Sequence, residues 1–181
     1  MKSRYRDLIE QTFYFPQEGY DVIDDCLHFY GVNLMEIIEQ YGTPLKITYL
    51  PKIGSQIRKA KRLFNVAIAK TDYKGTYTYC YCTKSSHFSY IMDEVLKNDV
   101  HLETSSAFDL PIIRNLHQRG KIGKNHFIIC NGFKRPQYIE NICDLLNDGF
   151  TNVIPVLDNM NELPHYEKKL KSKRKVKIGI R

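Results

Sequence analysis

Tyr77-Thr-Tyr-Cys-Tyr-Cys-Thr-Lys84-Ser-Ser-His87 is the stretch that decides the fold, because this run of β-forming residues ends abruptly at a lysine. Side chains alternate between the two faces of a strand, so Lys84 shares a face with the small Cys80 and Cys82, while the tyrosines occupy the other face. The pattern predicts a strand whose tyrosines pack under helices and whose carboxyl end carries Lys84.

A lysine at that place is a candidate for covalent chemistry. In an α/β barrel, ligands bind at the carboxyl ends of the strands. Apolar neighbours lower the pKa of an ammonium group, and the neutral amine forms a Schiff base with an aldehyde such as pyridoxal 5'-phosphate. A lysine that merely ends a strand in solvent is commoner, so Lys84 needs support from other features of the sequence.

The composition is that of a globular chain. It has 181 residues, of which 43% are hydrophobic and 26% charged, enough for one domain with a core. No apolar run approaches the roughly 20 residues of a membrane span, and the first residues lack a signal peptide, so we expect a cytoplasmic protein with no membrane partner. The five cysteines are an odd number without a Cys-x-x-Cys pair, which predicts free thiols and no metal site.

The net charge of +7 comes largely from a basic run at residues 168–177. The run contains no aromatic residues for base stacking, so we interpret it as a solvated helix end and predict no nucleic-acid partner. A non-catalytic binding module that docks an acidic partner or RNA through this run is the alternative from another functional class.

Residues 1–43 are predicted to be an amino-terminal lead-in with a short strand, Leu27–Gly31, and a helix, Leu34–Tyr41, which Asn33 caps and Gly42 ends. Residues 44–181 then alternate between strands and helices. The predicted strands are 44–50, 77–84, 100–103, 126–130, 152–157 and 175–180, and the predicted helices are 55–70, 88–98, 106–118, 136–147 and 161–170.

This alternation predicts an α/β fold, a partial (β/α)8 TIM-type barrel of parallel strands that is truncated after about the fifth strand. A complete barrel needs about 250 residues. The polar residues that follow the strands should converge at one rim, and they are Lys84, Ser85, Ser86, Glu103, Thr104, Ser105, Asn131, Lys134, Asp158, Asn159 and Arg181. The sequence has neither a glycine-rich phosphate loop nor a G-x-S-x-G motif, which argues against nucleotide hydrolases, dinucleotide enzymes and serine hydrolases.

Several sequence segments resemble those of a known protein family. The segment from Leu27 to Leu45, which ends in Tyr-Gly-Thr-Pro-Leu, is similar to the opening of the alanine-racemase-like (fold III) pyridoxal-phosphate decarboxylases. Further segments resemble the biosynthetic arginine decarboxylases in order and spacing, and they are residues 64–77, the lysine strand, 102–106, 129–134 and 138–139.

The resemblance implies that residues 44–181 are part of a cofactor-binding barrel, that Lys84 is the catalytic Schiff-base lysine, and that Glu103, Ser105 and Arg181 lie near the cofactor. It implies a homo-oligomer that decarboxylates a small-molecule amino-acid substrate, most directly L-arginine to agmatine and carbon dioxide in polyamine biosynthesis. Diaminopimelate decarboxylase is the near alternative. The sequence segments at residues 72–75 and 131–134 favour arginine over diaminopimelate as the substrate.

Two departures from the family stand out. The lysine motif usually reads Lys-x-Asn, whereas here it reads Lys84-Ser85-Ser86. The rest of the barrel and the carboxyl-terminal β-domain, with the family's phosphate loop and substrate residues, would lie beyond residue 181. We therefore expect weak cofactor binding and no efficient turnover from this chain alone.

Overall fold

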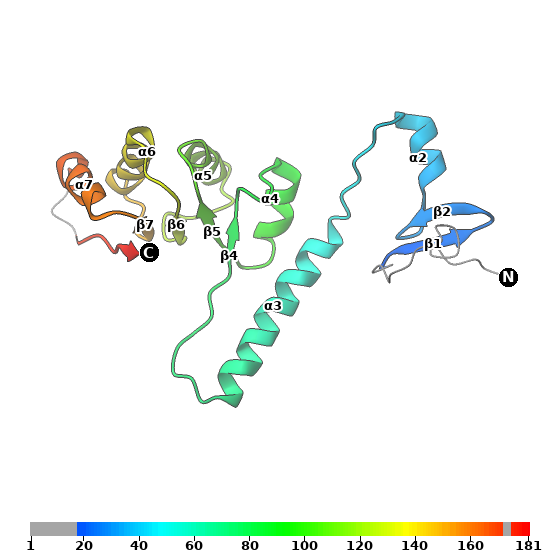
Figure 1. Cartoon of the computed structure of the whole chain (residues 1–181), viewed down its shortest axis with the longest axis horizontal. Coiled ribbons are helices and arrows are strands. Elements are labelled where there is room, and N and C mark those ends of the chain that lie inside the picture. The colour runs from blue at the N-terminus through cyan, green and yellow to red at the C-terminus, as the bar shows by residue number, and fades with distance from the viewer. Residues whose placement is uncertain (1–17, 172–174) are drawn as a thin grey trace. The chain divides into compact units, whose positions relative to one another are not determined.

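The computed structural model describes residues 18–171 and 175–181, which form two compact units that divide between Tyr49 and Leu50 (Figure 1). Most of the predicted irregular lead-in at residues 1–20 lies outside the described residues, as do positions 172–174 of the basic run. Among the described residues, no helix is both long and apolar enough to cross a membrane.

The first unit is a three-stranded antiparallel sheet followed by a helix, with β1 at Tyr20–Ile23, β2 at Cys26–Phe29, β3 at Val32–Asn33 and α2 at Leu34–Tyr41. The predicted helix and its cap are confirmed, because Asn33 Oδ1 accepts a hydrogen bond from the Met35 N–H at 2.9 Å. The sequence prediction missed β1 and β3. A tight turn joins β1 to β2 through Asp24 and Asp25, which both have positive φ angles, and such turns favour a hairpin.

The predicted strand at residues 44–50 is wrong. Its residues alternate like a strand, but none of them pairs with another described strand. Pro51 begins α3 (Pro51–Lys70), four residues before the predicted helix start, because proline fits the first turn of a helix, where its missing N–H is not needed.

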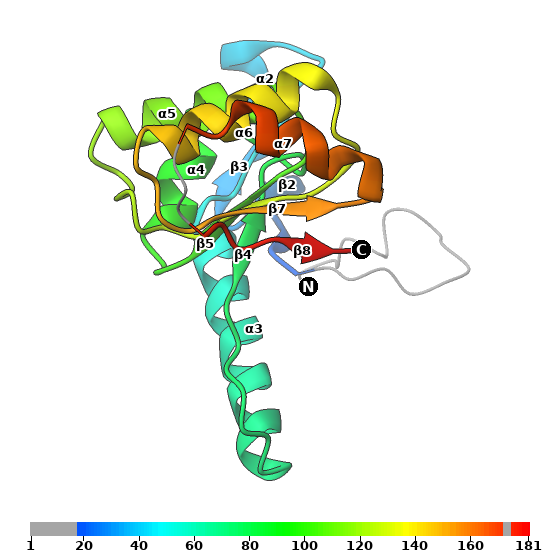
Figure 2. The same ribbon diagram turned by 90° about the vertical axis from the view of Figure 1, so that its left-hand side faces the viewer.

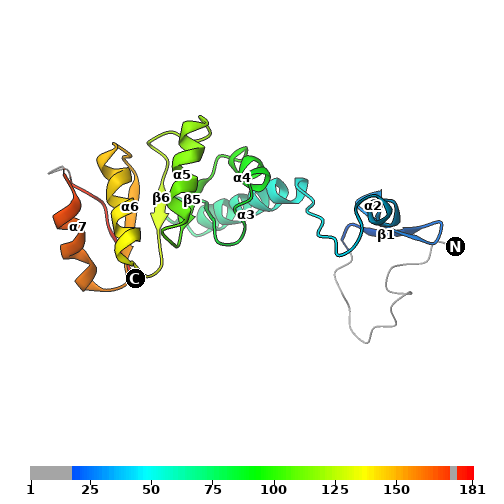
Figure 3. The same cartoon turned by 90° about the horizontal axis from the view of Figure 1, so that it is seen from above.

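The second unit contains five parallel strands in the order β4-β5-β6-β7-β8, which confirms a partial α/β architecture. Helices α5, α6 and α7 lie on the same side of the strands (Figures 2 and 3). The elements are β4 (Cys80–Cys82), α4 (Ser89–Leu96), β5 (His101–Thr104), α5 (Asp109–Gln118), β6 (Ile128–Cys130), α6 (Pro136–Asn147), β7 (Val153–Leu157), the 3-10 helix η1 (Met160–Glu162), α7 (Leu163–Lys169) and β8 (Gly179–Ile180).

Strand β4 is much shorter than the predicted strand at 77–84. It is an edge strand with β5 as its one partner among the described strands, and β5 begins only at His101, opposite Cys80. Tyr77 lies before this ladder and stacks instead on Phe64 of α3, with ring centroids 4.0 Å apart. The partner strand, rather than β propensity, therefore sets the length of β4.

The core lies between the sheet and its helices. Its main cluster joins strands β5, β6 and β7 to the helices that cover them, and its fully buried members include Leu102, Ile113, Ile128, Ile142, Leu145 and Val153. A second cluster connects α3 to α4 through Ile57, Ile91 and Val95. Tyr81 packs against both clusters, as the alternation of the strand predicted.

Two histidines form a contact at the amino-terminal end of the sheet. The rings of His101 and His126 pack edge to face, with centroids 5.3 Å apart. Each Nδ1 accepts a backbone N–H at 3.3 Å, from Phe127 and Gly123 respectively. Burial lowers the pKa of both imidazoles, and His101 lowers that of His126 further. The folded state therefore favours the neutral form of both imidazoles.

We predict that stability falls as the pH decreases below 6.5, the ordinary imidazole pKa, because the unfolded chain then binds protons that the folded chain resists. Protonation of Nδ1 also breaks a backbone hydrogen bond, although Asp99 opposes the effect by favouring the charged form. Thermal unfolding between pH 5 and 8 should show that the double variant His101→Gln, His126→Gln loses less stability at low pH than the wild type. A variant of the exposed His165, His165→Gln, should behave like the wild type.

The cysteines differ in exposure. Cys130 and Cys143 are buried, and burial raises their pKa values to about 12 and about 11, whereas Cys26, Cys80 and Cys82 are partly exposed. Because the thiolate is the reactive form, we predict that a thiol reagent at pH 8 modifies Cys130 and Cys143 only after unfolding. Peptide mass spectrometry after timed alkylation checks this, and fast labelling of Cys130 in the native protein would contradict the packing of β6.

Candidate functional site

The carboxyl ends of the parallel strands meet at one rim. The register places Cys82 beside Glu103, Glu103 beside Ile129, and Ile129 beside Ile154. Lys84 comes two residues after Cys82, Ser105 two after Glu103, and Asn131 two after Ile129. Hydrogen bonds extend the pairing beyond the strands, because Thr83 N–H donates to Glu103 O and Asn131 N–H donates to Thr104 O. The sheet therefore brings these separated segments together.

Lys84 lies in a turn directly after β4. The Ser85 hydroxyl closes this turn by donating to Cys82 O at 2.7 Å, and the buried Thr83 donates from both N–H and hydroxyl to Glu103 O. The lysine side chain is exposed and bonds to no described residue. The described residues therefore do not crowd this amine with apolar groups, contrary to the expectation from sequence.

Four of the predicted rim residues form a connected polar cluster. Asn131 Nδ2 donates to Glu103 Oε1 at 3.1 Å, and Arg181 Nη1 donates to Asn131 Oδ1 at 3.4 Å. The guanidinium of Arg181 also lies 3.9 Å from Asp158 Oδ1. Glu103 and Arg181, both predicted near the cofactor, are thus linked through a side chain whose role the sequence did not indicate.

Ser105 follows β5 and contacts a different partner. Asp109 Oδ2 accepts hydrogen bonds from the N–H groups of Ser105 and Ser106, at 2.8 and 3.0 Å, and also from both hydroxyls. Asp109 is 6% exposed, so a buried carboxylate holds the loop after β5 in place through these hydrogen bonds. Ser106-x-x-Asp109 matches the capping-box spacing, which was the sequence signal for its role.

Lys134 fixes the segment that follows β6. Its side chain is buried, and its ammonium donates to the backbone oxygens of Gly132 and Val156, so the segment is attached to β7. Burial lowers the pKa of Lys134, whereas the carboxylates of Glu162 and Asp158 raise it. The buried ammonium of Lys134 therefore connects the loop after β6 to strand β7.

A pocket of about 440 Å³ lies beside Ser105, between the segments that follow β5 and β6. Phe108 and Phe133, which are 79% and 71% exposed, line it together with Arg135 and the buried Tyr138. Tyr138 is anchored by a 2.8 Å hydrogen bond between its hydroxyl and that of Thr104. The rim therefore combines charged groups with exposed aromatic rings. Among the described residues, no cluster of three or more His, Cys, Asp or Glu side chains is placed to hold a metal ion.

We predict that Asp109→Ala destabilises the chain by about 1–3 kcal/mol, because two partly buried N–H groups lose their acceptor. Asp109→Asn keeps one oxygen and should cost less. Denaturant unfolding measures both, with Asp144→Ala, at an exposed position of α6, expected within about 0.5 kcal/mol of wild type. Equal effects of Asp109→Ala and Asp144→Ala would show that the loop does not need the carboxylate.

Comparison with known proteins identifies a relative in sequence. No protein-family model matches the chain. The chain is 28% identical over 124 residues to a protein described as biosynthetic arginine decarboxylase from Geobacter sulfurreducens. This alignment covers 66% of the chain but 19% of that protein, so the chain spans about a fifth of the length of the curated relative that it matches.

Two solved structures share the fold. The biosynthetic arginine decarboxylase SpeA from Campylobacter jejuni superposes with a TM-score of 0.65 at 20% identity, over 90% of this chain and 29% of that one. The diaminopimelate decarboxylase from M. jannaschi gives 0.70 at 16% identity, over 91% of this chain and 36% of that one. The chain thus resembles part of a biosynthetic arginine decarboxylase in sequence and has the fold of part of an alanine-racemase-like (fold III) decarboxylase barrel.

Proposed function

We propose that the chain is the lysine-bearing part of a pyridoxal-phosphate-dependent decarboxylase that converts L-arginine to agmatine and carbon dioxide. The observation that carries this proposal is the position of Lys84, directly beyond the first strand of the parallel sheet and next to the carboxyl end of β5. The sequence similarity to biosynthetic arginine decarboxylase supports it.

The side chains at the rim fit the chemistry of pyridoxal phosphate. An exposed primary amine can approach an aldehyde, and the guanidinium of Arg181 can face an anionic group. Glu103 supplies a carboxylate held by the Asn131 amide. Lys84, Glu103 and Arg181 would hold the cofactor, and Ser105 would line its edge.

Each of these residues has a definite task. The Lys84 amine must lose its proton before it can act as a nucleophile, and its exposed turn allows that proton to pass to solvent. Glu103 supplies a carboxylate on the neighbouring strand β5 that can accept a proton, while Arg181 orients a negative group. When bound, pyridoxal phosphate supplies an electron sink for the electron pair left by departing carbon dioxide.

The choice of arginine over diaminopimelate rests on the sequence relative and on the phrases at residues 72–75 and 131–134. Diaminopimelate is the second candidate substrate, supported by the fold shared with the M. jannaschi protein. The binding-module alternative lacks a specific supporting observation, and Lys169 of the basic run pairs with Glu140 of the chain's own α6.

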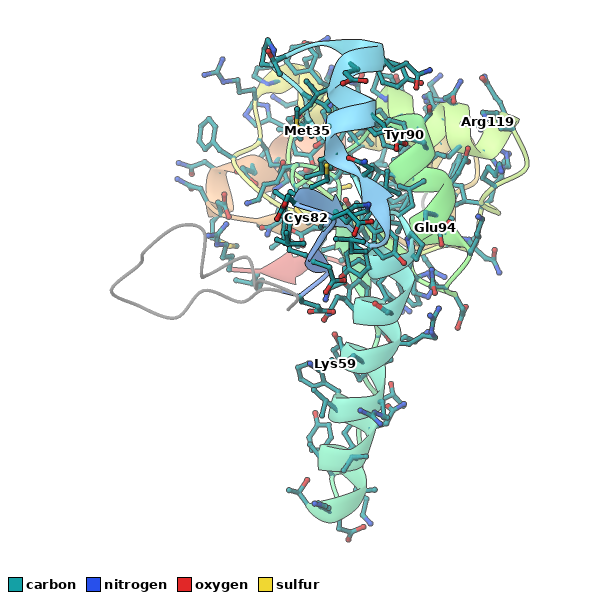
Figure 4. All side chains as sticks on the ribbon, turned by 90° about the vertical axis from the view of Figure 1, so that its right-hand side faces the viewer. Met35, Lys59, Cys82, Tyr90, Glu94 and Arg119 are labelled. Carbon is teal, nitrogen blue, oxygen red and sulfur yellow. The ribbon has the colours of Figure 1, made fainter. Side chains whose placement is uncertain are left out.

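We predict that pyridoxal phosphate attaches selectively to Lys84. Incubation with the aldehyde, reduction with borohydride and peptide mass spectrometry should place the pyridoxyl group mainly on this residue, and Lys84→Ala should remove the corresponding absorption band. Lys59→Ala is the matched control, because Lys59 is another exposed lysine, on α3 (Figure 4), and should leave the band unchanged.

Labelling spread evenly over the exposed lysines would contradict the assignment of Lys84. A band of full strength in Lys84→Ala would do the same.

A further inference from the structure

A neutral amide lies between two charged groups of the rim, Glu103 and Arg181, and Arg181 Nη1 also lies 3.9 Å from Asp158 Oδ1. Asn131 donates to the Glu103 carboxylate at 3.1 Å and accepts from the Arg181 guanidinium at 3.4 Å. Glu103 lies 28 residues before Asn131, and Arg181 lies 50 residues after it. No ion pair joins Glu103 to Arg181 directly in the described part of the chain.

The orientation of this amide is determined by the backbone. Gly132 N–H donates to Asn131 Oδ1 at 2.9 Å, so the oxygen must lie on that side and the NH2 group must face Glu103. With its oxygen on this side, Asn131 can accept from a guanidinium and donate to a carboxylate, but the reverse arrangement would lose both contacts.

The segment that carries Asn131 is held in place from two sides. Gly132 has a φ of +79°, and a Cβ at this position would lie 2.8 Å from the backbone oxygen of Ser105, so glycine permits close contact with the segment after β5. On the other side, the buried Lys134 donates to Gly132 O and Val156 O. Asn131 therefore projects from a rigid support.

We infer that Asn131 is a positioning residue, which keeps Glu103 and Arg181 apart and holds both toward a ligand beside Lys84. A carboxylate and a guanidinium in direct contact would satisfy each other. The amide instead occupies Glu103 Oε1 and Arg181 Nη1, the nitrogen that also lies near Asp158, and leaves the other carboxylate oxygen and the other guanidinium nitrogens for a ligand. This inference rests on the proposed function, because the ligand is pyridoxal phosphate bound at Lys84.

Asn131→Asp is the informative variant. It keeps an oxygen for Gly132 N–H and Arg181, so the loop is retained, but it loses the donor to Glu103 and places a second carboxylate there. Asn152→Asp is the matched control, because Asn152 Nδ2 donates to Asn125 O at 2.7 Å at the opposite end of the sheet.

Two measurements test the inference. In the chain without cofactor, the NMR signals of the Asn131 side-chain NH2 group should move when Glu103→Gln is introduced, whereas those of Asn152 should not. With pyridoxal phosphate, borohydride-trapped labelling of Lys84 should need about tenfold more aldehyde in Asn131→Asp, the effect of losing one charge-assisted hydrogen bond. Asn152→Asp should match the wild type.

The outcomes separate the inference from the function on which it rests. Unmoved Asn131 signals, or normal labelling of Lys84 in Asn131→Asp, would overturn the positioning role alone. Absence of selective Lys84 labelling in the wild type would overturn the proposed function. If Asn131→Asp fails to fold, labelling of Glu103→Gln replaces it, and an unchanged requirement for aldehyde there also overturns the positioning role.

Discussion

Parallel pairing of β4 through β8 is the constraint on which the rest of the site depends. In a parallel sheet the carboxyl ends of all strands lie at the same edge, so the residues that follow them must share one rim. The pairing continues past the strands through backbone bonds at Thr83, Asn131 and Arg181. These bonds place the turn of Lys84 beside the end of β5, although the helix α4 separates the two in sequence.

Buried charges give this rim its rigidity. Asp109 and Lys134 are both largely removed from water, and each meets backbone groups of opposite polarity, two N–H groups for the carboxylate and two oxygens for the ammonium. A buried charge costs little when it is satisfied in this way and much when a partner is missing. The two loops that follow β5 and β6 therefore have one well-defined conformation, and Gly132 lets them touch.

The chemistry at the rim follows from this rigidity. The amine of Lys84 is accessible, while Glu103 and Arg181 are held by the neutral side chain between them. An accessible amine at the same rim as a carboxylate and a guanidinium suits a ligand that carries an aldehyde and groups of both charges. The aromatic rings of Phe108 and Phe133 border the same region and give it an apolar margin. This combination is the physical basis of the proposed decarboxylase site.

The sequence alone determined the local elements with a strong signal and the class of fold. Helix α6 begins at Pro136 and ends at the Asn147–Gly149 segment, as those residues predicted, and Asn33 caps α2 as its side chain suggested. Alternation of strands and helices predicted the parallel sheet, and with it the meeting of Glu103, Asn131 and Arg181 at one rim.

Tertiary structure alone decided how long the strands are and what the rim residues contact. Residues 44–50 have the pattern of a strand but pair with none of the described strands, and β4 begins opposite the first residue of β5, so strand length depends on a neighbour far away in sequence. The exposure of Lys84 and the bridging position of Asn131 likewise arise from contacts across the sheet. Local patterns encode backbone preference, whereas these contacts exist only after distant segments have packed together.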